Sequence, residues 1–139
     1  MGRKKGGSRE KTTELIMEAT LKCLARTGHK KTTFASIASE AGLSSAIVVQ
    51  HFKEVENIFP YAFEYFMVGA QEKTADALNL VKLPYEKLRE YIAVSFNIVF
   101  GSPDGGRVYL MVYYFGIFDQ KVKFTHNQVK TIAVNRVES

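Results

Sequence analysis

The 139-residue sequence has one cysteine, three prolines and no apolar run long enough to span a bilayer. Because Cys23 is alone, no intramolecular disulfide can form, which fits a reducing compartment, and the thiol is expected to be buried and inert. The longest apolar run, residues 108–118, is shorter than the roughly 20 residues that a membrane-spanning helix needs. No apolar run follows the basic residues 1–9, so we predict no secretory signal, no membrane partner and a cytoplasmic protein.

Patterns that carry catalysis or bind metals are also missing from the sequence. The histidines His29, His51 and His126 are scattered, and no carboxylate or cysteine stands at a recognisable spacing from them. The stretch 101–106, GSPDGG, lacks the lysine and the preceding strand of a phosphate-binding loop, so it predicts a helix-breaking turn. We therefore predict no metal, no cofactor and no enzymatic activity.

Positive charge is concentrated in the first part of the chain. Residues 1–53 hold ten Lys and Arg against four Asp and Glu, whereas the remainder holds nine against ten. One interpretation is a solvated surface with a basic tail; the other is a protein that neutralises phosphates through one end and binds something else through the other.

Hydrophobic periodicity predicts an all-α protein with helices over residues 10–27, 33–41, 45–52, 54–80 and 84–100. Within the fourth of these, Pro60 is expected to kink the helix near Glu56 or Asn57. Residues 107–118 are apolar almost all round and also permit a strand, but the helical neighbourhood favours a buried helix. The tail, residues 119–139, has the pattern of a further, weakly amphipathic helix.

Residues 33–52, TFASIASEAGLSSAIVVQHF, have the pattern of a helix-turn-helix. Small side chains at Ala38 and Gly42 allow two short helices to cross closely, and Gly42 can adopt the positive φ that ends a helix. Thr33 is expected to cap the first of these helices, and the hydroxyl of Ser44 the second.

The same region resembles the N-terminal domain of the TetR family of bacterial repressors over about residues 10–60. The resemblance is carried by these residues in order: Ile16, Ala19, Leu24, Gly28, Thr32, Thr33, Ile37, Ala38, Ala41, Gly42, Leu43, Ser44, His51 and Phe52. It implies a basic arm (1–9), a three-helix helix-turn-helix domain (10–53) and a helical effector-binding and dimerisation domain (54–139). It also implies a homodimeric repressor that a small effector releases from a palindromic operator.

In a helix-turn-helix the second helix enters the major groove of double-stranded DNA. With Val48 and Phe52 turned inward, the outward residues are Ser45, Ala46, Val49 and Gln50, of which Gln50 is the best base reader. The remaining residues expected at the DNA are Ser44, which caps the reading helix, and Thr33, His51 and Lys53, which contact phosphates. Arg3, Lys4 and Lys5 lie in an arm that is either disordered or bound along the DNA. Family members commonly have Tyr at Val49 and Lys at Val55, so either DNA binding is weaker or Lys53 and the arm take over the phosphate contacts.

Nine of the 34 residues from 85 to 118 are aromatic, which fits either an effector cavity or an ordinary helix-bundle core. For a small apolar or aromatic effector, the expected contacts are Phe66, Met67, Phe96, Phe100, Tyr109 and Tyr113. Family members usually dimerise through two C-terminal helices, and this chain ends before both are complete, so it is either truncated or dimerises differently.

Two rival interpretations remain from the sequence. In the first, the chain is a helical module that binds a ligand or a protein, the helix-turn-helix is only a packing unit and the arm contacts acidic partners. In the second, the arm and the aromatic residues act at a membrane surface, but no basic amphipathic helix supports that role.

Overall fold

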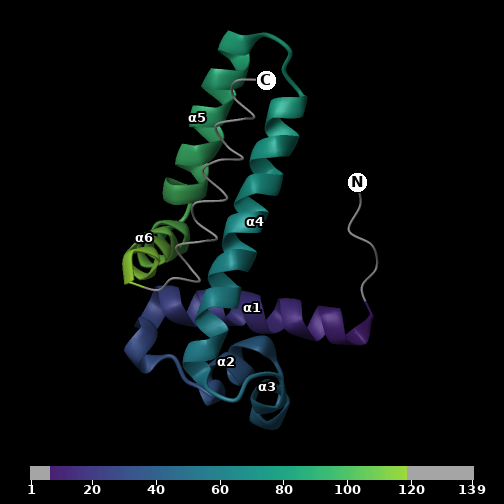
Figure 1. Cartoon of the computed structure of the whole chain (residues 1–139), viewed down its shortest axis with the longest axis vertical. Coiled ribbons are helices and arrows are strands. Elements are labelled where there is room, and N and C mark those ends of the chain that lie inside the picture. The colour runs from purple at the N-terminus through teal and green to yellow at the C-terminus, as the bar shows by residue number, and fades with distance from the viewer. Residues whose placement is uncertain (1–6, 119–139) are drawn as a thin grey trace. The chain divides into compact units, whose positions relative to one another are not determined.

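The structure is a computed structural model, and it describes residues 7–118. Those residues form six α-helices and no strand (Figure 1). The helices are α1 (Ser8–Thr27), α2 (Phe34–Ala41), α3 (Ser45–His51), α4 (Ile58–Asn79), α5 (Pro84–Phe100) and α6 (Pro103–Phe118), with short 3-10 helices at His29–Lys31 and Val55–Asn57. The predicted all-α class is confirmed. The arm residues Arg3, Lys4 and Lys5 and the predicted helix in the tail lie outside the described residues.

The chain divides into two compact units, Met1–Ala62 and Phe63–Ser139, and the division falls inside α4. The first turn of α4 therefore belongs to the core of the first unit, and the rest of the helix belongs to the second unit. The predicted domain boundary after Lys53 precedes α4 and stays a prediction.

The first unit has a core of aliphatic side chains contributed by its four α-helical segments. The side chains of Ile16, Leu24, Ile37, Val48 and Ile58 are all fully buried. Ala38, at 2% exposure, lies where α2 meets its neighbours, and its small side chain permits a close approach of the helices. Burial of these residues fixes which face of α3 points outward.

Two glycines with positive φ set the ends of α1 and α2. Gly28 (φ 77°) follows α1 and donates its N–H to the Leu24 carbonyl. Gly42 (φ 67°, ψ 31°) ends α2 in the left-handed conformation, and the Leu43 N–H donates to the Ala38 carbonyl at 2.9 Å, which closes a Schellman motif. The turn predicted at Gly42 is confirmed, and it directs the chain into α3.

Cys23 is buried in this core, as predicted. Burial raises the pKa of the Cys23 thiol; Ser36, by a hydrogen bond, lowers it, and the Glu40 carboxylate raises it. The neutral thiol therefore packs as a small apolar group.

Ser44 occupies the N-cap position of α3, but its side chain makes no capping hydrogen bond, so the predicted role of its hydroxyl is wrong. The Ser44 carbonyl instead accepts from the Ile47 N–H at 3.1 Å. The first turn of α3 is thus held by the backbone and by the burial of Val48.

The kink expected near Glu56 or Asn57 is also wrong, because α4 begins only at Ile58. The preceding residues form the 3-10 helix Val55–Asn57. Pro60 consequently lies in the first turn of α4, where its missing N–H has no intrahelical partner to lose.

The sequence predicted one helix-breaking turn over the glycine-rich stretch 101–106, but the structure differs. The chain breaks only at Gly101 and Ser102, and α6 begins at Pro103. The Ser102 hydroxyl accepts from the Gly105 N–H at 3.0 Å and so caps α6. A Cβ on Gly105 would lie 2.5 Å from the Ile98 carbonyl oxygen, and one on Gly106 would lie 2.9 Å from that of Val99. Glycine is needed there because α6 starts against the backbone of α5.

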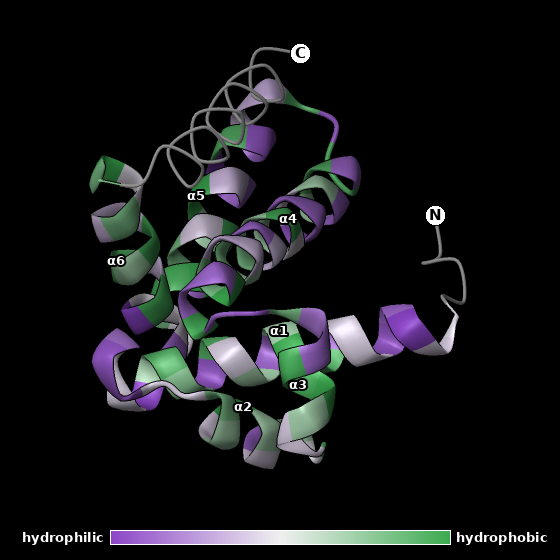
Figure 2. Cartoon of the chain, turned by 60° about the horizontal axis from the view of Figure 1, so that its bottom comes forward, coloured by the Kyte–Doolittle hydropathy of each residue, from purple (hydrophilic) through white to green (hydrophobic). Residues whose placement is uncertain are grey.

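Residues 107–118 are helical, as predicted, but α6 is not buried. Only Val108 and Val112 are buried among its residues, and Figure 2 shows α6 coloured hydrophobic along most of its length. Phe115 contacts Phe63 of α4 with ring centroids 5.4 Å apart. The described part of the second unit therefore leaves much apolar surface of α6 exposed, including Leu110, Tyr114, Ile117 and Phe118.

Candidate nucleic-acid interface and pocket

The outer face of α3 consists of the four side chains that the sequence predicted to point outward. Ser45, Ala46, Val49 and Gln50 are all exposed, and Val49 is 46% exposed. Val48 points to the opposite side and is fully buried. Phe52 follows α3 as its C-cap residue, is half-buried and contacts Tyr61 with ring centroids 5.7 Å apart. The geometry presents one amide, one hydroxyl and two small apolar groups on a short helix.

A capping box rigidifies the start of α2. The Thr33 hydroxyl accepts from the Ser36 N–H at 3.2 Å, and the Ser36 hydroxyl accepts from the Thr33 N–H at 2.9 Å. The amides of Phe34 and Ala35 lie in the same first turn, where the helix dipole favours an anion. Thr33 and Lys53, both predicted phosphate contacts, are exposed.

His51 is placed differently from the other predicted DNA contacts. Its Nδ1 lies 2.8 Å from the Ile47 carbonyl oxygen, one turn earlier in α3. Its Nε2 is buried and has no hydrogen-bond partner in the described part of the chain. In this conformation His51 offers neither ring nitrogen to a phosphate.

Some of the basic residues in the first unit serve its own packing. Glu40 of α2 pairs with two cations of α1, Arg26 at 3.1 Å and Lys22 at 3.6 Å. Lys30, Lys31 and Lys53 are exposed, and no carboxylate within residues 7–118 lies at ion-pair distance from them. These three lysines can therefore neutralise phosphates without breaking an ion pair within the described residues.

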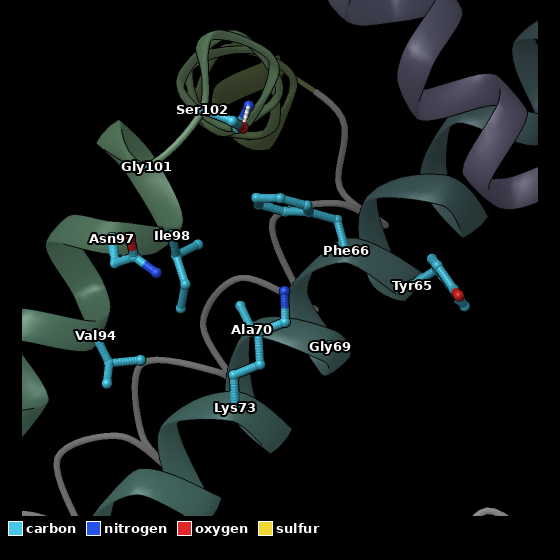
Figure 3. A pocket seen from close by; sticks show the side chains of 11 residues that line it. Tyr65, Phe66, Gly69, Ala70, Lys73, Val94, Asn97, Ile98, Gly101 and Ser102 are labelled. Carbon is cyan, nitrogen blue, oxygen red and sulfur yellow. Dashed lines mark hydrogen bonds between the residues drawn. The ribbon is translucent and has the colours of Figure 1, made fainter.

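The second unit contains a pocket of about 610 Å³ that the sequence did not locate (Figure 3). Its wall is formed by α4, α5 and the start of α6. The lining residues are Tyr65, Phe66, Gly69, Ala70, Lys73, Val94, Asn97, Ile98, Gly101, Ser102 and Gly105. A pocket of this size, whose described lining mixes apolar and polar groups, fits a small organic molecule.

Of the six predicted effector contacts, only Phe66 lines this pocket. Met67 is buried elsewhere. Phe96 and Phe100, at 62% and 72% exposure, contact each other with centroids 5.4 Å apart. Tyr109 and Tyr113 form a second ring pair at 5.4 Å; burial of Tyr109, followed by its interaction with Tyr113, raises the pKa of the Tyr109 phenol. The predicted aromatic contacts on α5 and α6 thus pair with each other and do not line the pocket.

The polar lining residues Lys73, Asn97 and Ser102 were not identified from the sequence. Lys73 and Asn97 lie on different helices, and their convergence depends on how α4 and α5 pack. The one signal available was the spacing on α4: Phe66, Ala70 and Lys73 recur at intervals that place them on one face of a helix.

The described residues show neither a metal site nor a membrane span. No group of three or more His, Cys, Asp or Glu in residues 7–118 is arranged to hold a metal ion. Within the same range, no helix combines the length and the apolar character needed to cross a bilayer.

The turn at Gly42 and the exposed face of α3 define a helix-turn-helix domain, and comparison with known proteins assigns that domain to a family. Residues 16–61 match the bacterial regulatory proteins of the TetR family. The matched segment runs from within α1 to the first turn of α4, so the helix-turn-helix domain of this chain is similar to that of TetR family regulators.

Two curated relatives are similar to this chain over more than half of its length. The HTH-type transcriptional regulator YerO of Bacillus subtilis is 30% identical over 86 residues, which are 60% of this chain and 30% of YerO. The regulator BetI of Paraburkholderia xenovorans is 28% identical over 92 residues, 66% of this chain and 47% of BetI. The chain thus matches less than half the length of either curated relative.

Solved structures extend the similarity of fold to nearly the whole chain. A TetR family regulator from Marinobacter aquaeolei superposes with a TM-score of 0.78 at 21% identity, covering 94% of this chain and 68% of that one. A transcriptional regulator from Saccharomonospora viridis, solved in complex with choline, superposes with a TM-score of 0.77 at 19% identity, covering 93% and 71%. The fold, a helix-turn-helix domain followed by a helical domain, is that of TetR family regulators.

Proposed function

We propose that the chain is a DNA-binding transcriptional regulator that places α3 in the major groove of a duplex. The observation that carries the proposal is the exposed outer face of α3, fixed by the buried Val48 behind it and by the left-handed turn at Gly42 in front of it. A rigid short helix with an outward amide is what direct base readout requires.

The outward residues have distinct roles in this proposal. Gln50 donates to and accepts from an adenine edge, and Val49 or Ala46 packs on a thymine methyl group. Thr33 and the first amides of α2 hold one phosphate, and Lys53 holds another. His51 offers neither ring nitrogen to a phosphate in this conformation, so the exposed Lys30 and Lys31 take its place among the proposed phosphate contacts.

The second part of the proposal is regulation by a small effector that binds in the pocket of the second unit. In a homodimer with two arrangements, the effector would bind more tightly to the arrangement that does not fit a palindromic operator. Binding would therefore shift the protein to that arrangement and relieve repression. The pocket volume of about 610 Å³ supports an effector of modest size. The choline bound to the Saccharomonospora viridis regulator supports a small molecule as the effector class.

The proposal is tested by selecting bound sequences from a random duplex pool and then titrating salt on the selected site. A palindromic consensus is expected, because two α3 helices of a dimer read two half-sites. Log affinity should fall linearly with log salt concentration, with a slope that drops by about 1 for Lys53→Ala. Lys82→Ala, an exposed lysine of the second unit, is the matched control and should leave the slope unchanged.

Absence of any enriched sequence, together with a flat salt dependence, contradicts DNA binding. That result would favour a helical module that binds a ligand or a protein.

A further inference from the structure

The described residues that line the pocket carry charge of one sign only. Lys73 is the single charged side chain among them, and they include no Asp or Glu. No carboxylate within residues 7–118 lies at ion-pair distance from the Lys73 ammonium. The ammonium is therefore available to an anionic group of a ligand.

Neutral polar groups from the facing side of the pocket complement Lys73. Asn97 of α5 contributes an amide, and Ser102 a hydroxyl. Ser102 Oγ accepts from the Gly105 N–H at 3.0 Å, so the hydroxyl hydrogen of Ser102 remains for a ligand acceptor. Ser102 also marks the N-terminus of the 16-residue helix α6, whose dipole adds positive potential at this edge.

The acidic residue nearest to this edge along the chain does not cancel that potential. Asp104 lies in the first turn of α6 and does not line the pocket. Its carboxylate is 3.9 Å from the Arg107 guanidinium, which offsets its charge. The described residues at the pocket therefore carry a net positive charge.

Most of the remaining described lining is apolar and leaves room for a hydrocarbon body. Figure 3 shows Phe66 of α4 and Val94 and Ile98 of α5 among the lining side chains. A Cβ built on Gly69 meets no atom within 4 Å, so the α4 wall is open at that position.

We propose that the pocket binds an organic monoanion, a carboxylate with an apolar body. The carboxylate pairs with Lys73, the amide of Asn97 and the hydroxyl of Ser102 offer further polar contacts along the lining, and the body lies against Phe66 and Ile98. The assignment rests on the proposed effector site and names its ligand class. A cationic ligand of the same size is rejected, because it would bring a like charge to Lys73 with no carboxylate in the described lining to pair with.

The test measures binding of three probes of matched length to the free protein by calorimetry: octanoate, octanamide and octyltrimethylammonium. Octanoate is expected to bind roughly tenfold more tightly than octanamide, the usual size of a hydrogen-bonded charge contribution, and octyltrimethylammonium more weakly than both. Lys73→Met should abolish the preference for octanoate over octanamide, and Lys73→Arg should retain it. Lys82→Met, a loop lysine outside the pocket, should behave as the unmodified protein.

A second variant tests the location, because exposed apolar side chains of α5 and α6 can also adsorb alkyl chains. Gly69→Leu places a side chain in the open space of the pocket and improves helix propensity at the same time. It should weaken octanoate and octanamide alike. Unchanged octanoate binding in Gly69→Leu would place the probe elsewhere and overturn the proposal.

The proposal is also overturned if octanoate fails to bind in the millimolar range, if octanamide or the cation binds as tightly, or if Lys73→Met keeps the preference. These measurements use no DNA, so they are independent of the selection experiment. A Lys73-dependent preference in a protein that enriches no duplex sequence would retain the ligand class and reject the regulator function. A palindromic consensus with no preference among the probes would do the reverse.

Discussion

Replacing single glycines in the second unit should change its stability in opposite directions. At Gly69, within α4, an added Cβ meets nothing within 4 Å. Gly69→Ala should therefore stabilise the unit by roughly 0.5–1 kcal/mol, the usual difference between the two residues within a helix. Gly105→Ala gains no more stability from helix propensity than Gly69→Ala does. The added Cβ, however, would lie 2.5 Å from the Ile98 carbonyl oxygen and 3.2 Å from Ser102 Oγ.

The clash at Gly105 decides the sign because its closest partner is backbone. Moving the Ile98 carbonyl requires α5 and α6 to separate, and overpacking of this kind costs typically about 1–3 kcal/mol. After the gain in propensity, Gly105→Ala should lower the free energy of unfolding by about 1–2 kcal/mol.

Urea denaturation followed by tyrosine fluorescence and far-ultraviolet circular dichroism would measure both variants against the unmodified chain. The close contact between α5 and α6 is refuted if Gly105→Ala is as stable as Gly69→Ala. A change in the denaturant slope without a change in the midpoint would indicate an altered unfolded state and not a clash. Because Gly105 also lines the pocket, its variant should bind octanoate more weakly at a concentration where it is folded.

Three further predictions concern the first unit. Gln50→Ala should relax sequence preference at one base pair of each half-site, with a cost of about 1–3 kcal/mol there, as measured by competition between duplexes that differ at that pair; an unchanged preference would remove Gln50 from base readout. Thr33→Ala should lower the free energy of unfolding by about 1 kcal/mol through loss of the capping box, and equal stability of the variant in urea would contradict the cap. Burial raises the pKa of the Cys23 thiol in the folded chain, so the stability that the neutral thiol contributes is fully present below the ordinary thiol pKa and is lost as the pH rises through the raised pKa. Rapid modification of the folded protein by a thiol reagent at pH 8 would show that the thiol is not buried.

The first unit could be predicted from the sequence because its determinants are local. A glycine that needs positive φ, a threonine that caps a helix and an aliphatic residue every three or four positions each act within one turn of their own element. The outward face of α3 followed from the same periodicity once Val48 was assigned to the core. His51 differs because its ring bonds to the Ile47 carbonyl oxygen, a competing local acceptor that the sequence pattern does not reveal.

The second unit was less predictable because its determinants are tertiary. Density of aromatic residues suggested a cavity lined by rings, yet Phe96 and Phe100 pair with each other and stay exposed. The pocket depends instead on how far apart α4 and α5 pack. The glycines near position 105 suggested a loop from their low helix propensity. They are needed instead because α6 lies close to the α5 backbone, and this packing is not visible in the sequence.

Helix α4 continues without interruption across the division between Ala62 and Phe63. Phe66, on the pocket wall, lies about one helical turn after Ala62, which belongs to the first core. A junction placed at either end of α4 would therefore remove part of this helix from one of the two units: Ile58 and Ala62 from the first core, or Phe66 from the pocket. Chimaeras that exchange the second unit between relatives should accordingly be joined within α4 after Ala62, so that each unit keeps the part of the helix that belongs to it.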